Sequence, residues 1–421
     1  MIPLPRLTSP RHVTSFPGAP VHPDTPPVTS ELPAHANEGL HVLAKPVGAA
    51  CNLDCGYCYY LDRARGEAPR AAARMSEAVL DAFVRKYVEA NPFPVVEFVW
   101  HGGEPTLAGL DFFRRAVALQ ARYAGGKRIR NALQTNGTLL DDAWAAFLAE
   151  HGFLVGLSLD GPREVHDRYR LDRGARPTFD LAMRGLATLQ RHGVEVNVLA
   201  TVARDTARRP GEVYAFLRDA GVQYMQFIPV VERVGPNGFA SPPDLSAPAA
   251  PAPVSPFTVV PEQYGTFLSV IFDTWRTRDI GRVFVMNFEW ALNLWIGNPS
   301  PVCVFSEQCG RALALEHDGS VYACDHFVRP RHRLGDILED ELGEMVARSL
   351  ASGFGVEKQS RLPRQCRRCP WLSLCHGECP KNRFATSRHG EPGLNYLCEG
   401  YKRFFGHIAP HLSAIATHMK P

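Results

Sequence analysis

The chain of 421 residues is predicted to be an α/β protein, a partial (β/α)6 TIM-like barrel followed by a cysteine-rich C-terminal domain. Three observations lead to this fold class. Short apolar runs alternate with segments of helical periodicity, which is typical of a parallel sheet. Polar motifs stand where several of those runs end. Eight of the 11 cysteines lie in the C-terminal third of the chain.

Six strands are expected from the apolar runs, separated by helices. The strands are placed at 41–45, 95–100, 130–134, 154–159, 194–201 and 224–228. The helices are placed at 76–90, 109–123, 141–150, 178–192 and 209–219, with Ser76 in position to cap the first of them. Residues 39–296 are therefore expected to form the barrel, and residues 297–415 the cysteine-rich domain.

Two stretches are rich in proline. Residues 1–38 contain nine prolines and residues 235–256 contain seven. Proline lacks a backbone N–H and interrupts both helices and sheets, so neither stretch is expected to build regular structure. The first is interpreted as a disordered tail and the second as a flexible insertion in the barrel.

Three cysteines stand close together after the first expected strand. Cys51, Cys55 and Cys58 lie in CNLDCGYCYY, with three and then two residues between them. This spacing indicates that one short loop supplies three thiolates to an iron–sulfur cluster. If the fourth iron receives no protein thiolate, it keeps open positions where a cofactor or substrate can bind.

The remaining eight cysteines are enough for two further clusters with four thiolates each. They are Cys303, Cys309, Cys324, Cys366, Cys369, Cys375, Cys379 and Cys398. Structural zinc is an alternative for the closely spaced C-terminal pairs. A second hypothesis is therefore a zinc-bound interaction module on a barrel without catalytic function. The three-thiolate loop counts against it, because a closed zinc site normally has four protein ligands.

Composition excludes several other classes of protein. The odd number of cysteines, the length and the lack of a signal pattern at the start argue against a secreted disulfide framework and favour the cytoplasm. A net charge of +3 gives no reason to expect a nucleic-acid partner. No apolar run is long enough to span a membrane.

Three polar motifs end the second, third and fourth expected strands. They are HGGEP with Glu104, QTNGT with Asn136 and SLDGP with Ser158. Each of them alone is explained equally well by turn chemistry. In a barrel-like parallel sheet, however, the residues that do chemistry lie at the carboxyl ends of the strands. The motifs are therefore expected to meet the cysteine loop at one mouth of the barrel.

The loop CNLDCGYCYY, followed by GGEP on the next strand, resembles the radical S-adenosylmethionine (SAM) superfamily. HGGEPTLAGLDFF, LQTNGTLLDDAWAAFL, FLVGLSLDGPREVHD and GSVYACDHFV are similar to segments of the anaerobic sulfatase-maturating enzymes. The C-terminal cysteine series resembles the twin-cluster SPASM domain of that family. The resemblance covers about residues 40–415 and implies three 4Fe-4S clusters and SAM as cofactors.

The resemblance also implies which cysteines act together. Cys51, Cys55 and Cys58 would hold the cluster that binds SAM. Two further sets would hold the auxiliary clusters: Cys303, Cys309, Cys324 and Cys379 the first, and Cys366, Cys369, Cys375 and Cys398 the second. Because these sets interleave along the chain, loss of one thiolate is expected to disturb both auxiliary clusters.

Five residues would contact SAM if the family pattern is carried over. Tyr57 resembles the aromatic residue near the adenine, and Glu104 the acceptor of the methionyl ammonium. Ser158 and Asn136 are candidates for polar contacts with SAM. Arg170 is the candidate that would neutralise the methionyl carboxylate, with an arginine exposed on the surface as the alternative.

The activity that the resemblance implies is oxidation of a cysteine or serine of a sulfatase polypeptide to Cα-formylglycine. A 5′-deoxyadenosyl radical would take a hydrogen atom, Asp325 would take the proton, and an auxiliary cluster would take the electron. A small redox protein would act as the electron donor. The alternative is an enzyme of the same architecture that crosslinks or otherwise modifies a ribosomally made peptide. His101 and His326 also lie near the inferred mouth but are not placed in the catalytic set.

Overall fold

The computed structural model describes residues 39–60, 74–235, 238–243 and 253–418. Their strands form one ten-stranded sheet, in the order β12-β11-β10-β1-β2-β3-β4-β5-β6-β9, and a separate sheet of β7 and β8. The strands are β1 His41–Ala44, β2 Val95–Trp100, β3 Arg128–Thr135, β4 Leu154–Ser158, β5 Glu195–Val202, β6 Tyr224–Pro229, β7 Val234–Gly235, β8 Gly238–Phe239, β9 Phe284–Val285, β10 Ala312–Leu315, β11 Ser320–Tyr322 and β12 Arg333–Asp336.

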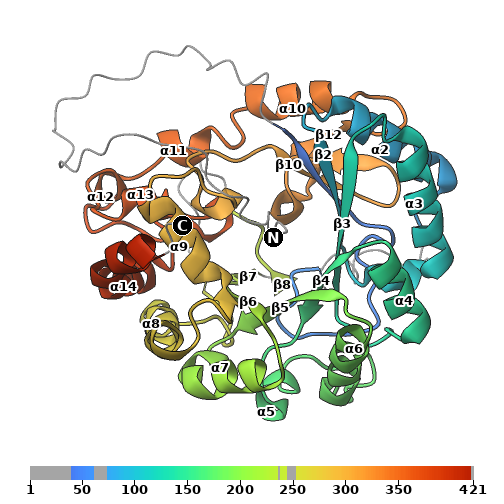
Figure 1. The fold of residues 1–421 in the computed structure, drawn as a ribbon. Coiled ribbons are helices and arrows are strands. Elements are labelled where there is room, and N and C mark those ends of the chain that lie inside the picture. The colour runs from blue at the N-terminus through green and yellow to red at the C-terminus, as the bar shows by residue number, and fades with distance from the viewer. Residues whose placement is uncertain (1–38, 61–73, 236–237, 244–252, 419–421) are drawn as a thin grey trace.

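Helices cover the outer face of the large sheet (Figure 1). The α-helices are α2 Glu77–Ala90, α3 Leu110–Tyr123, α4 Asp142–Glu150, α5 Arg163–His166, α6 Phe179–Arg191, α7 Pro210–Asp219, α8 Pro261–Arg278, α9 Met286–Trp295, α10 Leu342–Ala351, α11 Glu357–Ser360, α12 Arg364–Arg367, α13 Leu372–Cys375 and α14 Cys398–His418. Short 3-10 helices are η2 Pro105–Ala108, η3 Thr206–Arg208, η4 Cys303–Phe305, η5 Asp325–Phe327, η6 Pro330–His332 and η7 Pro380–Asn382.

The predicted fold class is confirmed. Strands β1 to β6 run parallel to their neighbours, and each overlaps one of the six strands expected from the sequence. Each of the five expected helices is also present. Ser76 caps α2, because its Oγ accepts a hydrogen bond of 3.2 Å from the backbone N–H of Val79. The sheet extends beyond the expected six strands, since β9 pairs with β6 and β10 pairs with β1.

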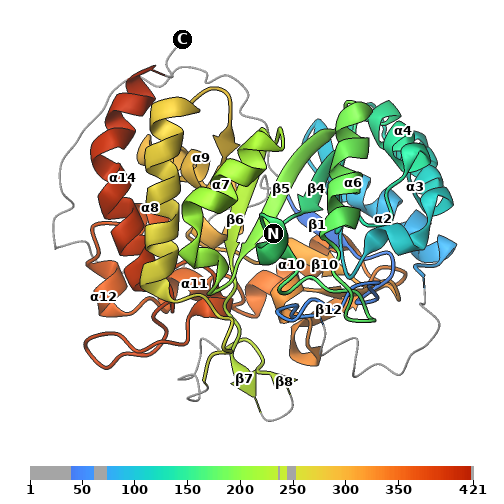
Figure 2. The ribbon, with the colours of Figure 1, turned by 90° about the horizontal axis from the view of Figure 1, so that it is seen from below.

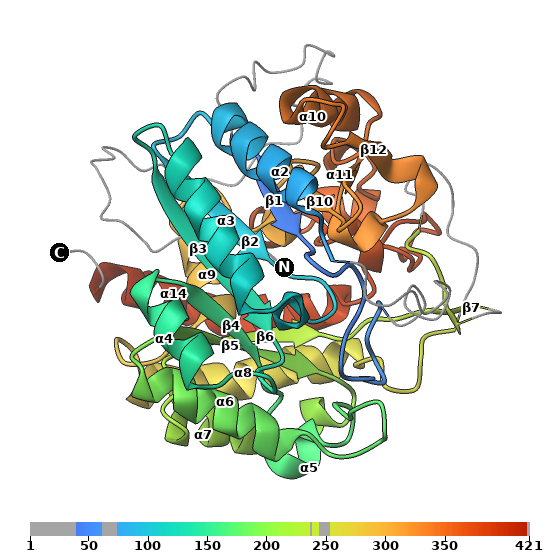
Figure 3. The ribbon, with the colours of Figure 1, turned by 90° about the vertical axis from the view of Figure 1, so that its right-hand side faces the viewer.

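Strand β2 shows how the sheet separates core from cavity. Val96, Phe98 and Trp100 are fully buried and belong to the apolar cluster between the sheet and the helices α2 and α3. These two helices lie side by side on the outer face (Figure 3). Val99 points the other way, as the two-residue period of a strand requires, and lines the interior of the barrel together with its β1 neighbour Leu43.

Two elements of the cysteine-rich part of the chain pack along the barrel. Strand β10 continues the sheet next to β1, with His41 paired to Ala312 and Ala44 to Leu315. Helix α14 lies along α8 on the other side of the molecule (Figure 2). The barrel wall is therefore open between β9 and β12, and residues from 297 onward extend from one edge of that opening to the other.

The close crossing of α8 and α14 gives a prediction about stability. A Cβ atom at Gly400 would lie 2.1 Å from the carbonyl oxygen of Pro261. Gly400→Ala should therefore lower the free energy of unfolding by about 1 to 3 kcal/mol, the usual cost of overpacking. Anaerobic thermal unfolding measures the change. The matched control is Gly406→Ala on the same helix, where only Trp371 comes near, at 3.8 Å, and helix propensity should add up to about 1 kcal/mol. Equal melting temperatures for the two variants would contradict the prediction.

The predictions for the two proline-rich stretches compare differently with the structure. Residues 1–38 lie outside the described part of the chain, so the predicted tail stays a prediction. In 235–256, the expectation of no regular structure is wrong at the edges. Strands β7 and β8 form a hairpin there, and Arg233 makes an antiparallel bridge with Val254. Paired backbone groups thus close the base of the insertion despite its prolines. In the described ranges, no helix combines the length and apolar character that crossing a membrane requires.

Candidate cofactor and active site

A cavity of about 290 Å³ lies inside the barrel. The loops that follow β1, β2, β3, β4 and β6 contribute to its lining, and β5 contributes residues near its carboxyl end, as expected for a barrel of parallel strands. The cysteine-rich part supplies the rest of the lining. All three cysteines of the N-terminal loop and Cys303, Cys309, Cys324 and Cys379 of the C-terminal domain line the same cavity. Both cysteine-bearing regions therefore meet in one interior space, called the central cavity below.

The N-terminal cysteine loop is held by hydrogen bonds to the segment that follows α5. The backbone N–H groups of Asp54 and Gly56 donate to the carbonyls of Leu171 and Tyr169, at 2.8 and 3.0 Å. Burial raises the pKa of the Cys55 thiol to about 12, and the nearby Cys58 raises it further, although Arg170 acts in the opposite direction. The loop thus brings the three thiols together, as their spacing predicts.

The first of the two predicted auxiliary sets is also brought together. Burial raises the pKa of Cys324, and the thiols of Cys303 and Cys309 contribute further to this rise. Burial likewise raises the pKa of Cys379, with added repulsion from Glu378 and then from Cys324. Cys379 is therefore grouped with cysteines far away in sequence, although Cys375 is much nearer to it along the chain.

The second set gathers around α12, α13 and the start of α14. Burial raises the pKa of Cys375, and Glu378, Cys398 and Cys366 raise it further. Burial also raises the pKa of Cys398, and the thiols of Cys366 and Cys369 contribute to this rise. These contacts place the four cysteines of the second predicted set in one region, and the interleaving of the two sets is present in the fold.

The chemistry of these donors fits iron–sulfur clusters. All 11 cysteines are free thiols. Within the described ranges, no three cysteine, histidine or acidic side chains are positioned to hold a single metal ion. Buried thiols that repel one another as thiolates need positive charge close by to stay ionised. A cluster of iron ions supplies that charge and takes thiolates as its ligands.

Glu104 has a different setting from the one expected of a ligand for an ammonium group. Its carboxylate is fully buried and does not line the central cavity. One oxygen accepts from the hydroxyls of Thr106 and Thr135 at 2.6 and 2.7 Å, and the other from the backbone N–H of Asn136 at 2.8 Å. The side chain thus ties the loop after β2 to the loop after β3. Its predicted contact with SAM stays a prediction.

The neighbouring glycines let two loops cross. A Cβ atom at Gly103 would lie 2.0 Å from the carbonyl oxygen of Ala50, and Gly102 has a φ of +120°. The backbone N–H of Gly103 donates to the carbonyl of Gly48 at 2.8 Å. The glycine pair therefore seats the loop that leads into Cys51, and the molecule it approaches closely is the chain itself.

Tyr57 and Arg170 form one buried group with Asp160. Arg170 donates to both carboxylate oxygens of Asp160, at 2.9 and 3.0 Å, and Tyr57 Oη donates to the same carboxylate. Asp160 also accepts from the backbone N–H of Thr201 at 2.8 Å. Arg170 is only 8% exposed, so the alternative of a surface arginine is wrong. Tyr57 and Arg170 line the central cavity, as the proposed cofactor contacts should.

Asn136 and Ser158 also line the central cavity. The Nδ2 of Asn136 donates to the Oδ1 of Asn52 at 2.9 Å and lies 3.8 Å from the Sγ of Cys51. Asn136 is therefore a direct neighbour of the cysteine loop. Ser158 ends β4 and is partly exposed to the cavity. The predicted contacts of Asn136 and Ser158 with SAM stay predictions.

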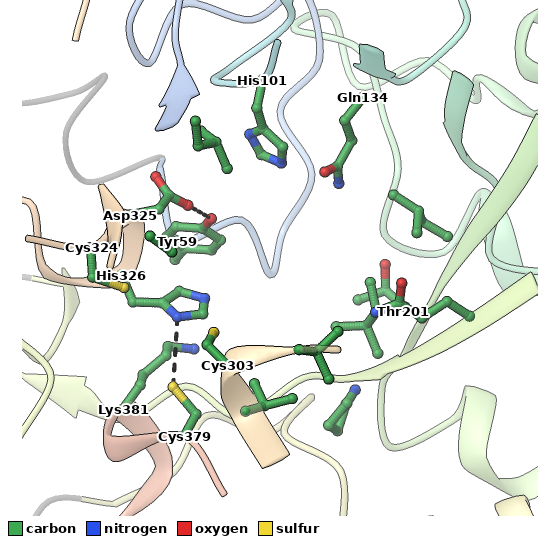
Figure 4. A pocket seen from close by; sticks show the side chains of 18 of the residues that line it. Tyr59, His101, Gln134, Thr201, Cys303, Cys324, Asp325, His326, Cys379 and Lys381 are labelled. Carbon is green, nitrogen blue, oxygen red and sulfur yellow. Dashed lines mark hydrogen bonds between the residues drawn. The ribbon is translucent and has the colours of Figure 1, made fainter. Parts of the chain in front are cut away.

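Asp325, the candidate base, is almost completely buried at the wall of the central cavity. Tyr59 Oη donates to its Oδ2 at 2.5 Å, and Tyr60 Oη lies 2.7 and 2.8 Å from the two oxygens. Lys45 Nζ is 2.6 Å from Oδ1. Figure 4 shows Tyr59 beside Asp325, with His101 nearby and Gln134 farther across the cavity. Three donors thus orient one carboxylate toward the space between the cysteine groups.

Sequence reasoning missed several residues of this site. Lys45 was assigned to the end of a strand, yet it is fully buried and also pairs with Glu316 at 2.7 Å. Asp160 was treated as part of a turn motif, and Tyr59 and Tyr60 as part of the cysteine motif. A lysine at the carboxyl end of a barrel strand was the available signal, because charged residues there face the mouth. Nothing local to Asp160 indicated its partner.

His101, left outside the catalytic set, lies in the cavity wall. Burial lowers its pKa to about 4, so the ring is neutral near pH 7. Its Nδ1 accepts from the backbone N–H of Gly102 at 2.6 Å, which puts the ring hydrogen on Nε2. That Nε2 is buried and has no hydrogen-bond partner among the described residues. His326 lies nearby, with its Nδ1 at 3.8 Å from the Sγ of Cys379.

Comparison with known proteins places this geometry in a family. Residues 46–217 match the radical SAM superfamily, and residues 303–370 match the SPASM iron–sulfur cluster-binding domain. The second match favours iron–sulfur clusters over structural zinc in the C-terminal part. The superfamily and the domain are thus the ones that the sequence motifs predict.

Proteins of similar sequence and structure agree with the match to the radical SAM superfamily. The chain is 43% identical to the serine-type anaerobic sulfatase-maturating enzyme of Bacteroides thetaiotaomicron, over 89% of this chain and 90% of that protein. It is 33% identical to the cysteine-type enzyme of Clostridium perfringens, over 90% and 99%. The solved structure of native anSMEcpe with bound AdoMet and Cp18Cys peptide superimposes with a TM-score of 0.79, at 32% identity over 90% of this chain and 99% of that one. The chain belongs to the anaerobic sulfatase-maturating enzymes of the radical SAM superfamily.

Proposed function

We propose that this enzyme oxidises a serine or cysteine side chain of a sulfatase polypeptide to Cα-formylglycine. The observation that carries the proposal is the position of Asp325. Its carboxylate lines the same cavity as the three N-terminal cysteines and directly follows Cys324. A base at this point has access to a side chain that reaches into the cavity. The names of the relatives, both serine-type and cysteine-type, support the class of substrate.

The residues are assigned to the cofactors as follows in this proposal. Cys51, Cys55 and Cys58 hold the cluster that binds SAM, and Tyr57, Arg170, Ser158 and Asn136 line the SAM site. Each of the two C-terminal cysteine sets holds one further cluster, so the chain carries three. When bound, these groups would supply the removal of one hydrogen atom from the target carbon and an acceptor for the electron that leaves next.

The protein must still remove a proton from the target oxygen or sulfur. Asp325 is the proposed base, because an ionised carboxylate can accept that proton where it lies within hydrogen-bond reach. Lys45, Tyr59 and Tyr60 each donate to this carboxylate. The same donors fix its direction. The buried surroundings limit competing proton transfer to water.

We propose further that residues 39–296 are the radical SAM domain and residues 297–415 the SPASM domain, with β10 of the second domain paired to β1 of the first. The electron for SAM cleavage is proposed to come from a small redox protein, and the reaction to take place in the reducing cytoplasm. The 11 free thiols support that compartment, because oxidising compartments favour disulfides.

One experiment tests the proposed function directly. The reconstituted enzyme is incubated anaerobically with SAM, a reductant and a peptide carrying a Cys-x-Pro-x-Arg segment or its serine counterpart. Mass spectrometry should show a formylglycine residue at the target position. The control peptide carries alanine at that position and should stay unmodified. Deoxyadenosine formation with both target peptides unchanged would overturn the proposed substrate class.

His101 gives a prediction about substrate binding. His101 lines the central cavity, and its buried Nε2 has no hydrogen-bond partner among the described residues, so we propose that it donates to the bound polypeptide. His101→Phe should raise the KM for the peptide by about 10-fold, since a lost hydrogen bond costs about 1 kcal/mol or somewhat more. His101→Gln keeps a donor and should stay closer to the wild type. Steady-state kinetics under anaerobic conditions measure both variants. An unchanged KM in His101→Phe would refute the contact.

A further inference from the structure

Two cations are buried deep in the cysteine-rich domain. Lys358, on α11, has an exposed fraction of 0%, and Arg383, after η7, has one of 1%. Lys358 Nζ donates to three backbone carbonyls, those of Cys303, Val304 and Ser306, at 2.6, 2.9 and 2.5 Å. Arg383 donates to the carbonyls of Gly393, Lys358 and Arg361, at 2.8, 2.5 and 2.6 Å. Each cation therefore donates hydrogen bonds to three main-chain carbonyls.

Neither cation has a counter-ion among the described residues. Backbone carbonyls carry only partial negative charge, and no described carboxylate forms an ion pair with Lys358 or Arg383. Glu378 lies within electrostatic reach of Lys358, but its carboxylate accepts hydrogen bonds from Asn382 and Asn395 instead. Buried charges without an opposite charge are costly, so a further anion is expected here.

The two cysteine sets surround these cations. Burial lowers the pKa of Arg383, and four cysteines counteract this: Cys366, Cys375, Cys309 and Cys379. Two of them belong to each set, so Arg383 lies within electrostatic reach of both. Lys358 Nζ lies 2.6 Å from the carbonyl oxygen of Cys303, a member of the first set. The missing anions are therefore thiolates, together with whatever those thiolates bind.

We propose that Lys358 and Arg383 are the fixed counter-charges of the two auxiliary clusters and raise their reduction potentials. The inference rests on the proposed function, in which each cysteine set holds one cluster. Reduction adds one electron, and so one negative charge, to a site of four thiolates. A fixed cation nearby stabilises the reduced form more than the oxidised form, so the potential rises. A higher potential favours uptake of the electron that leaves the oxidised substrate.

The test measures potentials, not activity. The full-length chain carrying alanine at Cys51, Cys55 and Cys58 is reconstituted with iron and sulfide, so that only the auxiliary clusters contribute signals. Midpoint potentials are then read by electron paramagnetic resonance during a dithionite titration. Arg383→Gln and Lys358→Met are each expected to move a midpoint to lower potential. Arg383→Lys and Lys358→Arg keep the charge and should stay near the parent value.

A matched control is Arg364→Gln, which removes an exposed cation from the same region and should move the midpoints much less. Full iron content with unchanged midpoints in both neutral variants would overturn the inference. If a neutral variant binds less iron, recovery in the charge-retaining variant supports the counter-charge, and failure to recover overturns it. A parent protein that binds no iron at the C-terminal sets contradicts the proposed function instead.

Discussion

Replacement of Cys51, Cys55 and Cys58 by alanine is expected to abolish cleavage of SAM to 5′-deoxyadenosine. The three thiols come from one loop and line the central cavity. Without them no iron site with an open position forms there. Liquid chromatography of dithionite-treated, SAM-containing reactions measures the product, and iron analysis should show the loss of one cluster out of three.

The control for this variant is Asp54→Asn, which changes an exposed side chain of the same loop and should cleave SAM at the normal rate. The iron that remains in the triple variant tests whether the C-terminal sets fill independently. Substantial deoxyadenosine formation by the triple variant would disprove the assignment of these cysteines to the SAM site.

Asp325→Asn is expected to separate SAM cleavage from product formation. Asparagine has the same shape but cannot take up a proton, so formylglycine formation should fall by about 10² to 10⁴-fold. Deoxyadenosine formation should remain within a few-fold of the wild type, because the cysteine loop is untouched. Lys45 keeps its contact with Glu316, which limits the loss of stability. Parallel assays of deoxyadenosine and of the modified peptide measure the two steps.

Asp318→Asn is the matched control, since this aspartate is exposed in the turn after β10 and lies outside the cavity lining. It should leave both assays unchanged. A normal yield of formylglycine from Asp325→Asn would show that another group removes the proton. Equal loss of both products would instead point to a structural role for this carboxylate beside Cys324.

The barrel could be predicted from sequence because its signals are local. Apart from Glu97, the run Val95–Trp100 consists of valine and aromatic residues, and Ser76 caps the helix before it, so residue pattern and capping alone locate both elements. The joining of β10 to β1 could not be predicted in this way. Each of these strands has four residues, and the pairing links His41 to Ala312. Nothing in either short stretch specifies a partner so distant in the chain.

In the candidate site, too, the features with local signals could be predicted, and those that depend on distant residues could not. The spacing of Cys51, Cys55 and Cys58 is local and indicates a shared ligand at once. The sorting of the other eight cysteines came from resemblance, since spacing alone would have joined Cys379 with Cys375. Lys45 was missed because its meaning depends on Glu316, 271 residues away. The setting of Glu104 was missed because a carboxylate in a glycine-rich turn gives no sign of how many backbone and hydroxyl donors surround it.

The pairing of β10 with β1 bears on how the enzyme can be dissected or recombined. A barrel cut after residue 296 would leave the backbone of His41–Ala44 without its partner, an open edge that invites self-association. Chimeras that exchange the cysteine-rich half between relatives must preserve this four-residue register, because a slip of one residue would turn Leu313 and Leu315 away from the core. The barrel and the cysteine-rich domain should therefore be expressed and engineered together, as one folding unit.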